Sequence, residues 1–166
     1  MYNVPGEFGL EIPEECESVG ICVDIPNYPN EQAKQIVEKL KASGVITDDT
    51  TELDDTRRVG PAEENVELCK SEQRTLTPKA GVDEEGHWHV VLNPDDNPTQ
   101  QFAVEMCSVE NSSCAKFVVF QPGYEGVCIQ SYMYYPMRII HTDGTKSKKN
   151  LKLPTTCSCV VRRKES

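Results

Sequence analysis

Apolar residues recur with a helical period in one clear stretch near the start of the chain. The stretch consists of Ala33, Ile36, Val37 and Leu40, spaced i, i+3, i+4 and i+7. This spacing predicts a helix with one apolar face. Asn30, which follows a proline, predicts the N-cap of this helix, and Gly44 predicts its end. We expect the apolar face to pack against another part of the protein, because such a face is unfavourable in water.

From Cys69 onward, short apolar segments alternate with turn signals, which is typical of β hairpins. The strongest turn signals are residues 93–98, which contain two prolines, and the Asp143-Gly144 pair. The second part of the chain is therefore expected to be all-β. The expected strands cover residues 90–92, 102–106, 116–120, 127–133, 138–141 and 150–153.

Between these two parts, residues 45–58 are polar and acidic and show no apolar periodicity. Such a segment predicts an exposed linker, which is the kind of segment that proteases reach first. The linker ends in the basic pair Arg57-Arg58, followed by Val59. A trypsin-like protease needs a basic residue in an extended, accessible segment. The sequence therefore predicts cleavage after Arg58.

The chain has eight cysteines, an even number that is spread over most of its length. They are Cys16, Cys22, Cys69, Cys107, Cys114, Cys128, Cys157 and Cys159. Such a set is typical of a disulfide framework formed in an oxidising compartment. A structural zinc site would favour paired C-x2-C motifs, and the sequence has none. Cys157 and Cys159 are too close in sequence to bond each other comfortably, so we expect each to have a different partner.

The net charge of −10 is unevenly distributed. Residues 1–58 carry 13 acidic and 5 basic side chains, whereas residues 128–166 carry 2 acidic and 8 basic ones. The acidic first part disfavours generic nucleic-acid binding. No apolar run reaches the ~18 residues of a membrane span, so we expect no membrane insertion. The first residues lack the pattern of a signal peptide, and for a secreted protein this predicts a truncated chain.

Sequence signatures of catalysis are absent. The chain has no nucleophile elbow, no phosphate-binding loop and no metalloprotease helix. We therefore expect no enzymatic activity, no catalytic residue and no cofactor.

Trp88 is the only tryptophan, and two interpretations of it stay open. It is either a half-buried strand residue or an exposed anchor for a receptor, since large aromatic side chains dominate binding hot spots. His87 and His89 flank it and would share one face of a strand. A metal site would need a further ligand from the acidic residues 83–85, and only a loop that folds back would supply it. We expect exposed histidines without a metal.

Two further surface features have candidate roles. Asn111 begins the only acceptable glycosylation sequon, Asn111-Ser112-Ser113, and its occupancy is open because it lies between two closely spaced cysteines. Basic residues gather at 146–149 and 162–164. Such clusters predict either solvated surface or a contact with a receptor or polyanion.

Several motifs of the second part together resemble one known family. The motifs are Val59-Gly60 after the basic pair, Thr77-Pro78-Lys79, Trp88, the six-residue spacing between Cys107 and Cys114, Tyr124-Glu125-Gly126-Val127-Cys128, and the segment from Leu153-Pro154-Thr155-Thr156 through Cys157-Ser158-Cys159-Val160. This part of the chain resembles the Spätzle family, the Toll-receptor ligands of insects, and more distantly the vertebrate neurotrophins. The resemblance covers residue 59 to the end, and residues 21–29 resemble the pro-region of the family more loosely.

The resemblance implies an architecture. Residues 59–166 would form an all-β, elongated cystine-knot domain with antiparallel hairpins, and residues 1–58 would be a short, partly helical propeptide. The knot would join Cys69 to Cys128, Cys107 to Cys157 and Cys114 to Cys159, which leaves Cys16 and Cys22 to pair with each other. Spacing alone allows 15 pairings of six cysteines, so this connectivity rests on the resemblance.

The resemblance also implies a function. The chain would be a secreted, extracellular cytokine-like precursor that a clip-type serine protease cleaves between Arg58 and Val59, and Asp55 disfavours a furin-type protease. The mature homodimer would bind a Toll-family receptor ectodomain, with Trp88 as a receptor-binding residue. Thr156 stands where the family has the cysteine that links the two subunits, so we expect a non-covalent dimer.

Three other functions stay open from the sequence. The alternatives are a neurotrophin-like growth factor for another receptor, a secreted protease inhibitor with Arg58 as the bait residue, and a structural matrix protein. An inhibitor would stay bound to its protease, and a matrix protein would show no saturable receptor binding.

Overall fold

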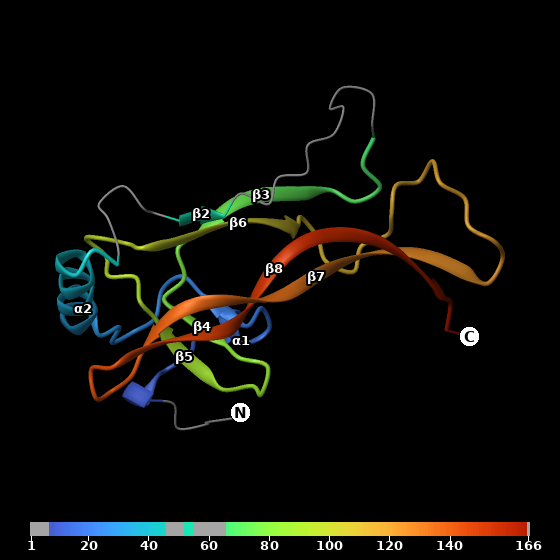
Figure 1. Ribbon diagram of the computed structural model, residues 1–166. Coiled ribbons are helices and arrows are strands. Elements are labelled where there is room, and N and C mark those ends of the chain that lie inside the picture. Colours follow the sequence, from blue (N-terminus) through green and yellow to red (C-terminus); the bar gives the residue numbers. More distant parts are fainter. Residues whose placement is uncertain (1–6, 46–51, 55–65, 166) are drawn as a thin grey trace. The chain divides into compact units, whose positions relative to one another are not determined.

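A computed structural model describes residues 7–45, 52–54 and 66–165 (Figure 1). The chain divides into two compact units. Unit 1 comprises Met1–Asp55, Thr75–Phe102 and Tyr134–Leu153, and unit 2 comprises Thr56–Arg74, Ala103–Met133 and Pro154–Ser166. Unit 1 therefore contains residues from both sides of the predicted cleavage point.

Strands dominate the described residues, and the two α-helices lie within the first 42 residues. The elements are η1 (Glu7–Gly9), α1 (Glu14–Glu17), β1 (Ile21–Cys22), α2 (Asn30–Ala42), β2 (Glu52–Asp54), β3 (Ser71–Leu76), β4 (Ala80–Val82), β5 (Trp88–Val91), β6 (Gln100–Cys107), β7 (Tyr124–Ile140) and β8 (Lys146–Arg163). One sheet has the order β1-β4-β5-β7-β8 and the other β2-β6-β3. The predicted all-β class, preceded by a partly helical segment, is confirmed. None of the described helices is long and apolar enough to cross a membrane.

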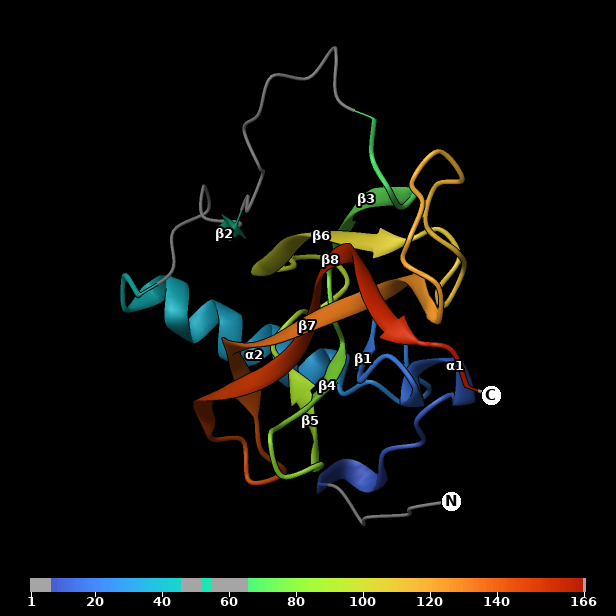
Figure 2. The same cartoon turned by 90° about the vertical axis from the view of Figure 1, so that its right-hand side faces the viewer.

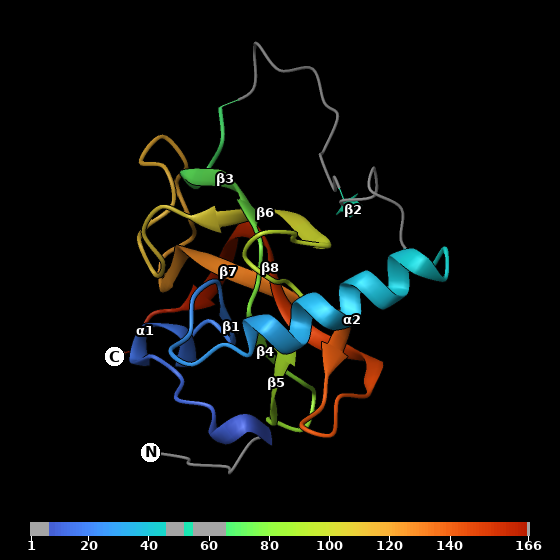
Figure 3. The ribbon, with the colours of Figure 1, turned by 90° about the vertical axis from the view of Figure 1, so that its left-hand side faces the viewer.

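Helix α2 forms where the apolar period predicted it. Figure 3 shows the course of α2. Its four buried side chains, Ala33, Ile36, Val37 and Leu40, pack against Val90 in β5, Leu92 directly after it and Ile140 at the end of β7. Burial of each large aliphatic side chain contributes roughly 1.5–3 kcal/mol. The predicted N-cap is wrong, because Pro29 occupies that position and no side chain caps the helix.

Strand β1 joins the first part of the chain to the sheet of unit 1. It pairs antiparallel with β4, with Ile21 opposite Gly81 and Cys22 opposite Ala80. Strand β4 pairs in turn with β5. The sheet therefore contains residues that precede the predicted cleavage point as well as residues that follow it.

The two longest strands exceed the predicted segments. Strands β7 and β8 are neighbours in the sheet and run side by side in Figures 1 and 2. Strand β7 joins the two segments predicted at 127–133 and 138–141, and β8 continues past 150–153 through Cys157 and Cys159. Pairing between long neighbouring strands continues through polar residues, so apolar patterning underestimates their length.

The strand predicted at residues 116–120 is wrong. This segment forms a turn in which the amide of Val118 donates to the carbonyl of Ala115 at 3.2 Å. Val119 is 91% exposed, and Phe120 instead packs against the buried cluster of Cys69, Cys114 and Cys128, here called the cysteine cluster. The apolar residues of 116–120 therefore do not belong to a strand. In the predicted linker, residues 52–54 form β2, which pairs parallel with β6.

Candidate functional site

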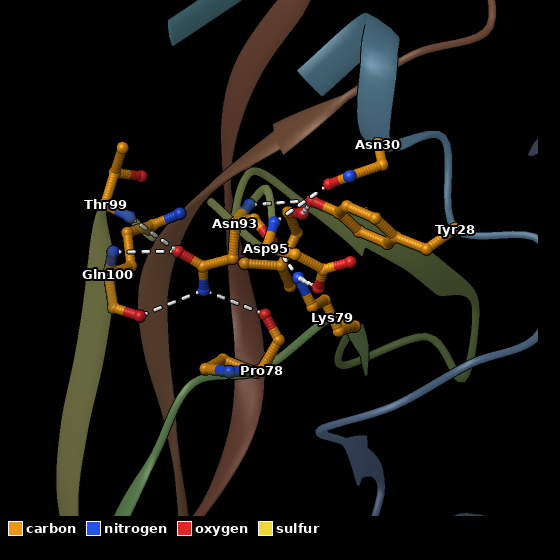
Figure 4. A network of polar contacts seen from close by, with 9 residues as sticks. Tyr28, Asn30, Pro78, Lys79, Asn93, Asp95, Thr99 and Gln100 are labelled. Carbon is orange, nitrogen blue, oxygen red and sulfur yellow. Dashed lines mark hydrogen bonds and ion pairs between the residues drawn. The ribbon is translucent and has the colours of Figure 1, made fainter. Parts of the chain in front are cut away.

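The candidate site in unit 1 is the surface where residues 8–45, here called the leading segment, contact residues 78–100. Helix α2 and strand β1 supply its apolar and backbone contacts. Next to them, the leading segment meets a buried polar network in the turn that follows β5 (Figure 4). The site is thus built from two parts of the chain that lie on opposite sides of the predicted cleavage point.

Tyr28 connects the leading segment to this network. Its hydroxyl donates to the carbonyl of Val91 at 2.5 Å and accepts from the amide of Asn93 at 2.7 Å. Burial raises the pKa of Tyr28 well above its usual range, more than the hydrogen bond from the Asn93 amide lowers it. The same amide of Asn93 also donates to the carbonyl of Val91 at 2.9 Å. Tyr28 therefore stays neutral and adds a second hydrogen-bond partner to each of these two backbone groups.

Asn93 is fully buried and organises the turn. Its side-chain nitrogen donates to the carbonyls of Pro78 at 2.8 Å and Gln100 at 2.9 Å. Its side-chain oxygen accepts from the amides of Thr99 at 3.0 Å and Gln100 at 2.8 Å. A buried amide with all these partners specifies one loop conformation, because an unsatisfied polar group at this position would be costly.

Lys79 places a buried positive charge beside Tyr28. Its ammonium donates to the carbonyl of Asn93, pairs with Asp95 at 2.6 Å and lies 4.4 Å from the centre of the Tyr28 ring. The side chain of Lys79 is only 9% exposed, whereas that of Asp95 is 67% exposed. The aromatic ring of the leading segment therefore covers a cation that would otherwise face water.

Weaker polar contacts surround this centre. The amide of Asp95 donates to Oδ1 of Asn30 at 2.8 Å, and Lys34 pairs with Asp96 at 2.6 Å. Both contacts are exposed, so we expect them to contribute less than the buried contacts of Tyr28. The side chain of Asn30 thus bridges to the turn and does not cap its own helix.

Trp88 lies on β5 and is half-buried. It packs against the cluster of Cys22, Ile25 and Ala80, together with Leu10 and Ile12. Most of these neighbours belong to the leading segment. The structure therefore matches the interpretation of Trp88 as a half-buried strand residue in the uncleaved chain.

In unit 2, the structure joins Cys69 to Cys128, Cys107 to Cys157 and Cys114 to Cys159, and it joins Cys16 to Cys22 in unit 1. This is the pairing that the resemblance implies. All eight cysteines are used, so none is free. The Sγ atoms of Cys69, Cys114 and Cys128 lie within 4.8 Å of one another, but all three are in disulfides and are not metal ligands.

One glycine allows the cysteine cluster to close. A Cβ on Gly126 would collide with the ring of Phe120 and lie 3.1 Å from Sγ of Cys114. Phe120 covers the cluster on this side. Gly126 belongs to the motif of residues 124–128 that resembles the family. A glycine at this position has a steric reason, since any side chain there would displace the ring or the disulfide.

The remaining candidate residues are dispersed. Arg58 and Val59 lie outside the described residues. Asn111 is exposed, with a φ of 64°, and its amide donates to the carbonyl of Cys128 at 2.9 Å. Thr156 is half-buried in β8, where its carbonyl accepts from the Gln130 side chain at 3.1 Å. The two basic clusters lie at the exposed ends of β8.

Sequence reasoning missed the buried polar network. Residues 93–98 signalled a turn but not that Asn93 is buried, and Tyr28 appeared only as part of the loosely matching pro-region. Lys79 belonged to a matching motif without a stated role. The sequence around Tyr28 and Lys79 does not indicate that their side chains are buried, because both residue types are often exposed. Only the fold shows that the two side chains are in contact.

Several exposed apolar side chains lie in unit 2. Among its described residues they include Val109, Phe117, Val119, Val160 and Val161, each at least 40% exposed. Met133, at the end of the second segment of this unit, is also 40% exposed.

Comparisons with known proteins show which sequences this chain is similar to. The chain is 26% identical over 145 residues to Protein spaetzle of Drosophila melanogaster, a match that covers 85% of this chain and 43% of the relative. It is 22% identical over 107 residues to Protein spaetzle 5 of the same organism, covering 64% of this chain and 27% of the relative. The chain thus spans less than half the length of these relatives.

A crystal structure of the spatzle cystine knot matches with 22% identity and a TM-score of 0.38, covering 61% of this chain and all of that one. The family model described as Spaetzle matches residues 66–161, which is more than half of the chain. The chain therefore belongs to the Spaetzle family.

Proposed function

We propose that this chain is the precursor of a secreted, non-enzymatic, cytokine-like ligand. A clip-type serine protease cleaves it after Arg58, and the dimer of residues 59–166 then binds the ectodomain of a Toll-family receptor. Family membership supports the ligand role, and the four disulfides support an extracellular location.

The observation that carries this proposal is the way the leading segment covers the rest of unit 1. Four side chains of α2 pack on Val90, Leu92 and Ile140, and Tyr28 covers Lys79. These contacts shield Lys79, Val90 and Leu92 while the chain is intact. No disulfide joins the leading segment to the residues that follow Arg58. The backbone is therefore their only covalent connection, and cleavage after Arg58 would cut it. The leading segment would then be free to leave.

Trp88 is the residue that we expect to change most on activation. In the uncleaved chain it packs against Cys22 and Ile25. Departure of the leading segment would expose its ring, and exposed aromatic side chains are favoured as binding anchors. We therefore assign Trp88 to the receptor-binding surface of the cleaved protein.

The dimer is the second element of the proposal. A knot domain with exposed apolar side chains can cover them by two-fold pairing. Because all eight cysteines are bonded within the chain and Thr156 replaces the linking cysteine, the pairing would be non-covalent. The mature fragment should therefore run as a monomer on a non-reducing denaturing gel. Light scattering at micromolar concentration should report about twice the chain mass. A monomer at every concentration would exclude the two-fold model.

The central experiment measures binding of cleaved and uncleaved protein to a panel of Toll ectodomains. We expect saturable binding of the cleaved form to at least one ectodomain and weaker binding of the uncleaved form. Trp88→Ala should weaken binding by more than ~1–2 kcal/mol without loss of the fold. Absence of binding to every ectodomain would favour a neurotrophin-like ligand for another receptor. A stable complex with the cleaving protease would favour an inhibitor with Arg58 as its bait residue.

A further inference from the structure

The turn between β4 and β5 brings three potential metal ligands together. The side chains of Asp83, Glu85 and His87 each offer one ligand atom, and these atoms lie within 4.8 Å of one another. Nδ1 of His87 lies 3.4 Å from Oε2 of Glu85 and 3.7 Å from Oδ2 of Asp83. In a tetrahedral zinc site with bonds of about 2.0–2.2 Å, neighbouring donor atoms are roughly 3.3–3.6 Å apart. The observed distances are close to this spacing.

The backbone of the turn produces this convergence. Oδ1 of Asp83 accepts from the amides of Glu85 and His87, both at 2.9 Å. Gly86 has a φ of 87°, which reverses the chain between these two residues. The turn therefore folds the acidic residues back toward the histidines, which the sequence did not indicate. It also leaves Oδ2 of Asp83 as the carboxylate oxygen that faces His87.

His89 holds Asp83 in place. Its Nε2 lies 2.7 Å from Oδ2 of Asp83, which is a hydrogen-bond distance and is short for two ligands of one zinc ion. The Asp83 side chain is 3% exposed. The contact with His89 and the two amide contacts of Oδ1 therefore fix the orientation of this carboxylate toward His87.

From this geometry we propose that the β4–β5 turn binds one divalent transition-metal ion of the zinc type. Asp83, Glu85 and His87 are the ligands, His89 is the positioning residue for Asp83, and water completes the coordination. An imidazole ligand favours zinc over magnesium or calcium, which prefer oxygen ligands alone. The site differs from the expectation from sequence alone, which included no metal.

Metal binding would act on the hairpin that links the two parts of unit 1. Strand β4 pairs with β1 of the leading segment, and β5 carries Trp88. An ion that joins residues 83, 85 and 87 would restrict the turn between these strands. We therefore expect slower amide exchange at residues 83–89 and a higher thermal unfolding midpoint when zinc is present.

Lys149 provides a way to sharpen the test. Its ammonium lies 3.7 Å from Oδ2 of Asp83 and therefore competes with a metal cation for this carboxylate. Lys149→Gln should consequently strengthen zinc binding by several-fold. A site formed by unrelated surface carboxylates would show no dependence on this one lysine.

The experiment is a calorimetric titration of the full chain with Zn²⁺ at neutral pH in a buffer that does not chelate metals. The fluorescence of Trp88 is recorded in parallel, because it is the only tryptophan and follows His87 directly. We expect one equivalent of Zn²⁺ to bind, with a change in fluorescence. His87→Ala and Glu85→Gln should each weaken binding by at least about tenfold. Both side chains are more than half exposed, so these variants should keep the fold.

His141→Ala is the matched control, because His141 lies in the turn between β7 and β8 and its ring contacts Ser147. This variant should bind Zn²⁺ as the unchanged protein does. The proposal is overturned if the unchanged protein binds no Zn²⁺, or if all variants bind it equally. It is also overturned if excess Ca²⁺ displaces the ion, since that would indicate a site of oxygen ligands alone. If Asp83 serves only to cap the turn, either the unchanged protein binds no Zn²⁺ or all variants bind it equally.

Discussion

The two units of this protein are stabilised by different means. Among the described residues, the buried hydrophobic side chains of unit 2 other than proline are Cys69, Val104, Cys114, Val127 and Cys128, so three of these five are half-cystines. Unit 1 instead buries a helix face, aliphatic strand residues and a polar network, and it has one disulfide. Unit 2 therefore depends mainly on covalent bonds, as small β structures with little core do.

The difference between the two units predicts which contacts the proposed cleavage after Arg58 would change. The leading segment contributes side chains to unit 1 and is bound there by non-covalent contacts. The three bridges of unit 2 join residues that all follow Arg58. Loss of the leading segment should consequently alter unit 1 and leave the disulfide-bonded part intact, as the proposed release of a stable ligand requires.

The largest expected effect comes from removal of disulfides. The bridge between Cys107 and Cys157 closes a separation of 50 residues, whereas that between Cys16 and Cys22 closes one of 6. In the chain-entropy model, their removal costs about 4 and about 2 kcal/mol. Urea unfolding of the two double serine variants should show this order. Equal losses would mean that the two units do not differ in their dependence on disulfides.

The next effect comes from the core of unit 1. Leu40→Ala removes a side chain that is 1% exposed and should lower the free energy of unfolding by about 2–5 kcal/mol. Hydrogen exchange should accelerate at the amides of β5 and stay unchanged around Cys107 and Cys128. Glu38→Ala, on the exposed side of the same helix, is the control and should change neither. Faster exchange around the cysteines would show that unit 2 also depends on the leading segment.

A smaller effect is expected from the polar network. Tyr28→Phe removes the hydroxyl that pairs with Val91 and Asn93 and leaves two backbone groups without that partner. The expected loss in the free energy of unfolding is about 1–3 kcal/mol. Tyr134→Phe is the matched control, because Tyr134 is 42% exposed. Chemical denaturation of both variants measures the difference, and equal stability of the two would argue against a structural role for the Tyr28 hydroxyl.

The sequence predicted the elements that have a regular apolar period and missed those that depend on distant partners. Helix α2 follows its predicted stripe, whereas the segment at 116–120 looked like a strand and instead supplies Phe120 to the cysteine cluster. The turn at 93–98 was predicted, but the buried role of Asn93 was not. Its four hydrogen bonds go to Pro78, Thr99 and Gln100, and local sequence contains no information about such contacts.

The same reasoning applies to the metal site proposed at the β4–β5 turn. The two histidines were visible as a pair on one face, and the acidic residues were visible as neighbours. Whether they meet depends on the conformation at Gly86 and on two amide contacts to Asp83. A local turn of this kind can be inferred only when its backbone geometry is known.

The smallest expected effect comes from the pair of Lys34 and Asp96. The hydrogen bond from Lys34 lowers the pKa of Asp96, and the same bond raises the pKa of Lys34. The contribution of Asp96 is therefore present above the unfolded pKa of about 3.9 and is lost as the pH falls through its lowered folded value. The contribution of Lys34 is present below the unfolded pKa of about 10.4 and is lost as the pH rises through its raised folded value.

A double-mutant cycle with Lys34→Ala and Asp96→Asn isolates this pair. The coupling should be small near neutral pH, should vanish in acid as Asp96 becomes protonated, and should shrink in high salt because both groups are exposed. The buried contact of Tyr28 should keep its effect at the same salt concentration. A coupling that exceeds the Tyr28→Phe loss, or that salt leaves unchanged, would reverse the order proposed here. In that case charge at the rim, and not burial at the centre, would hold the leading segment in place.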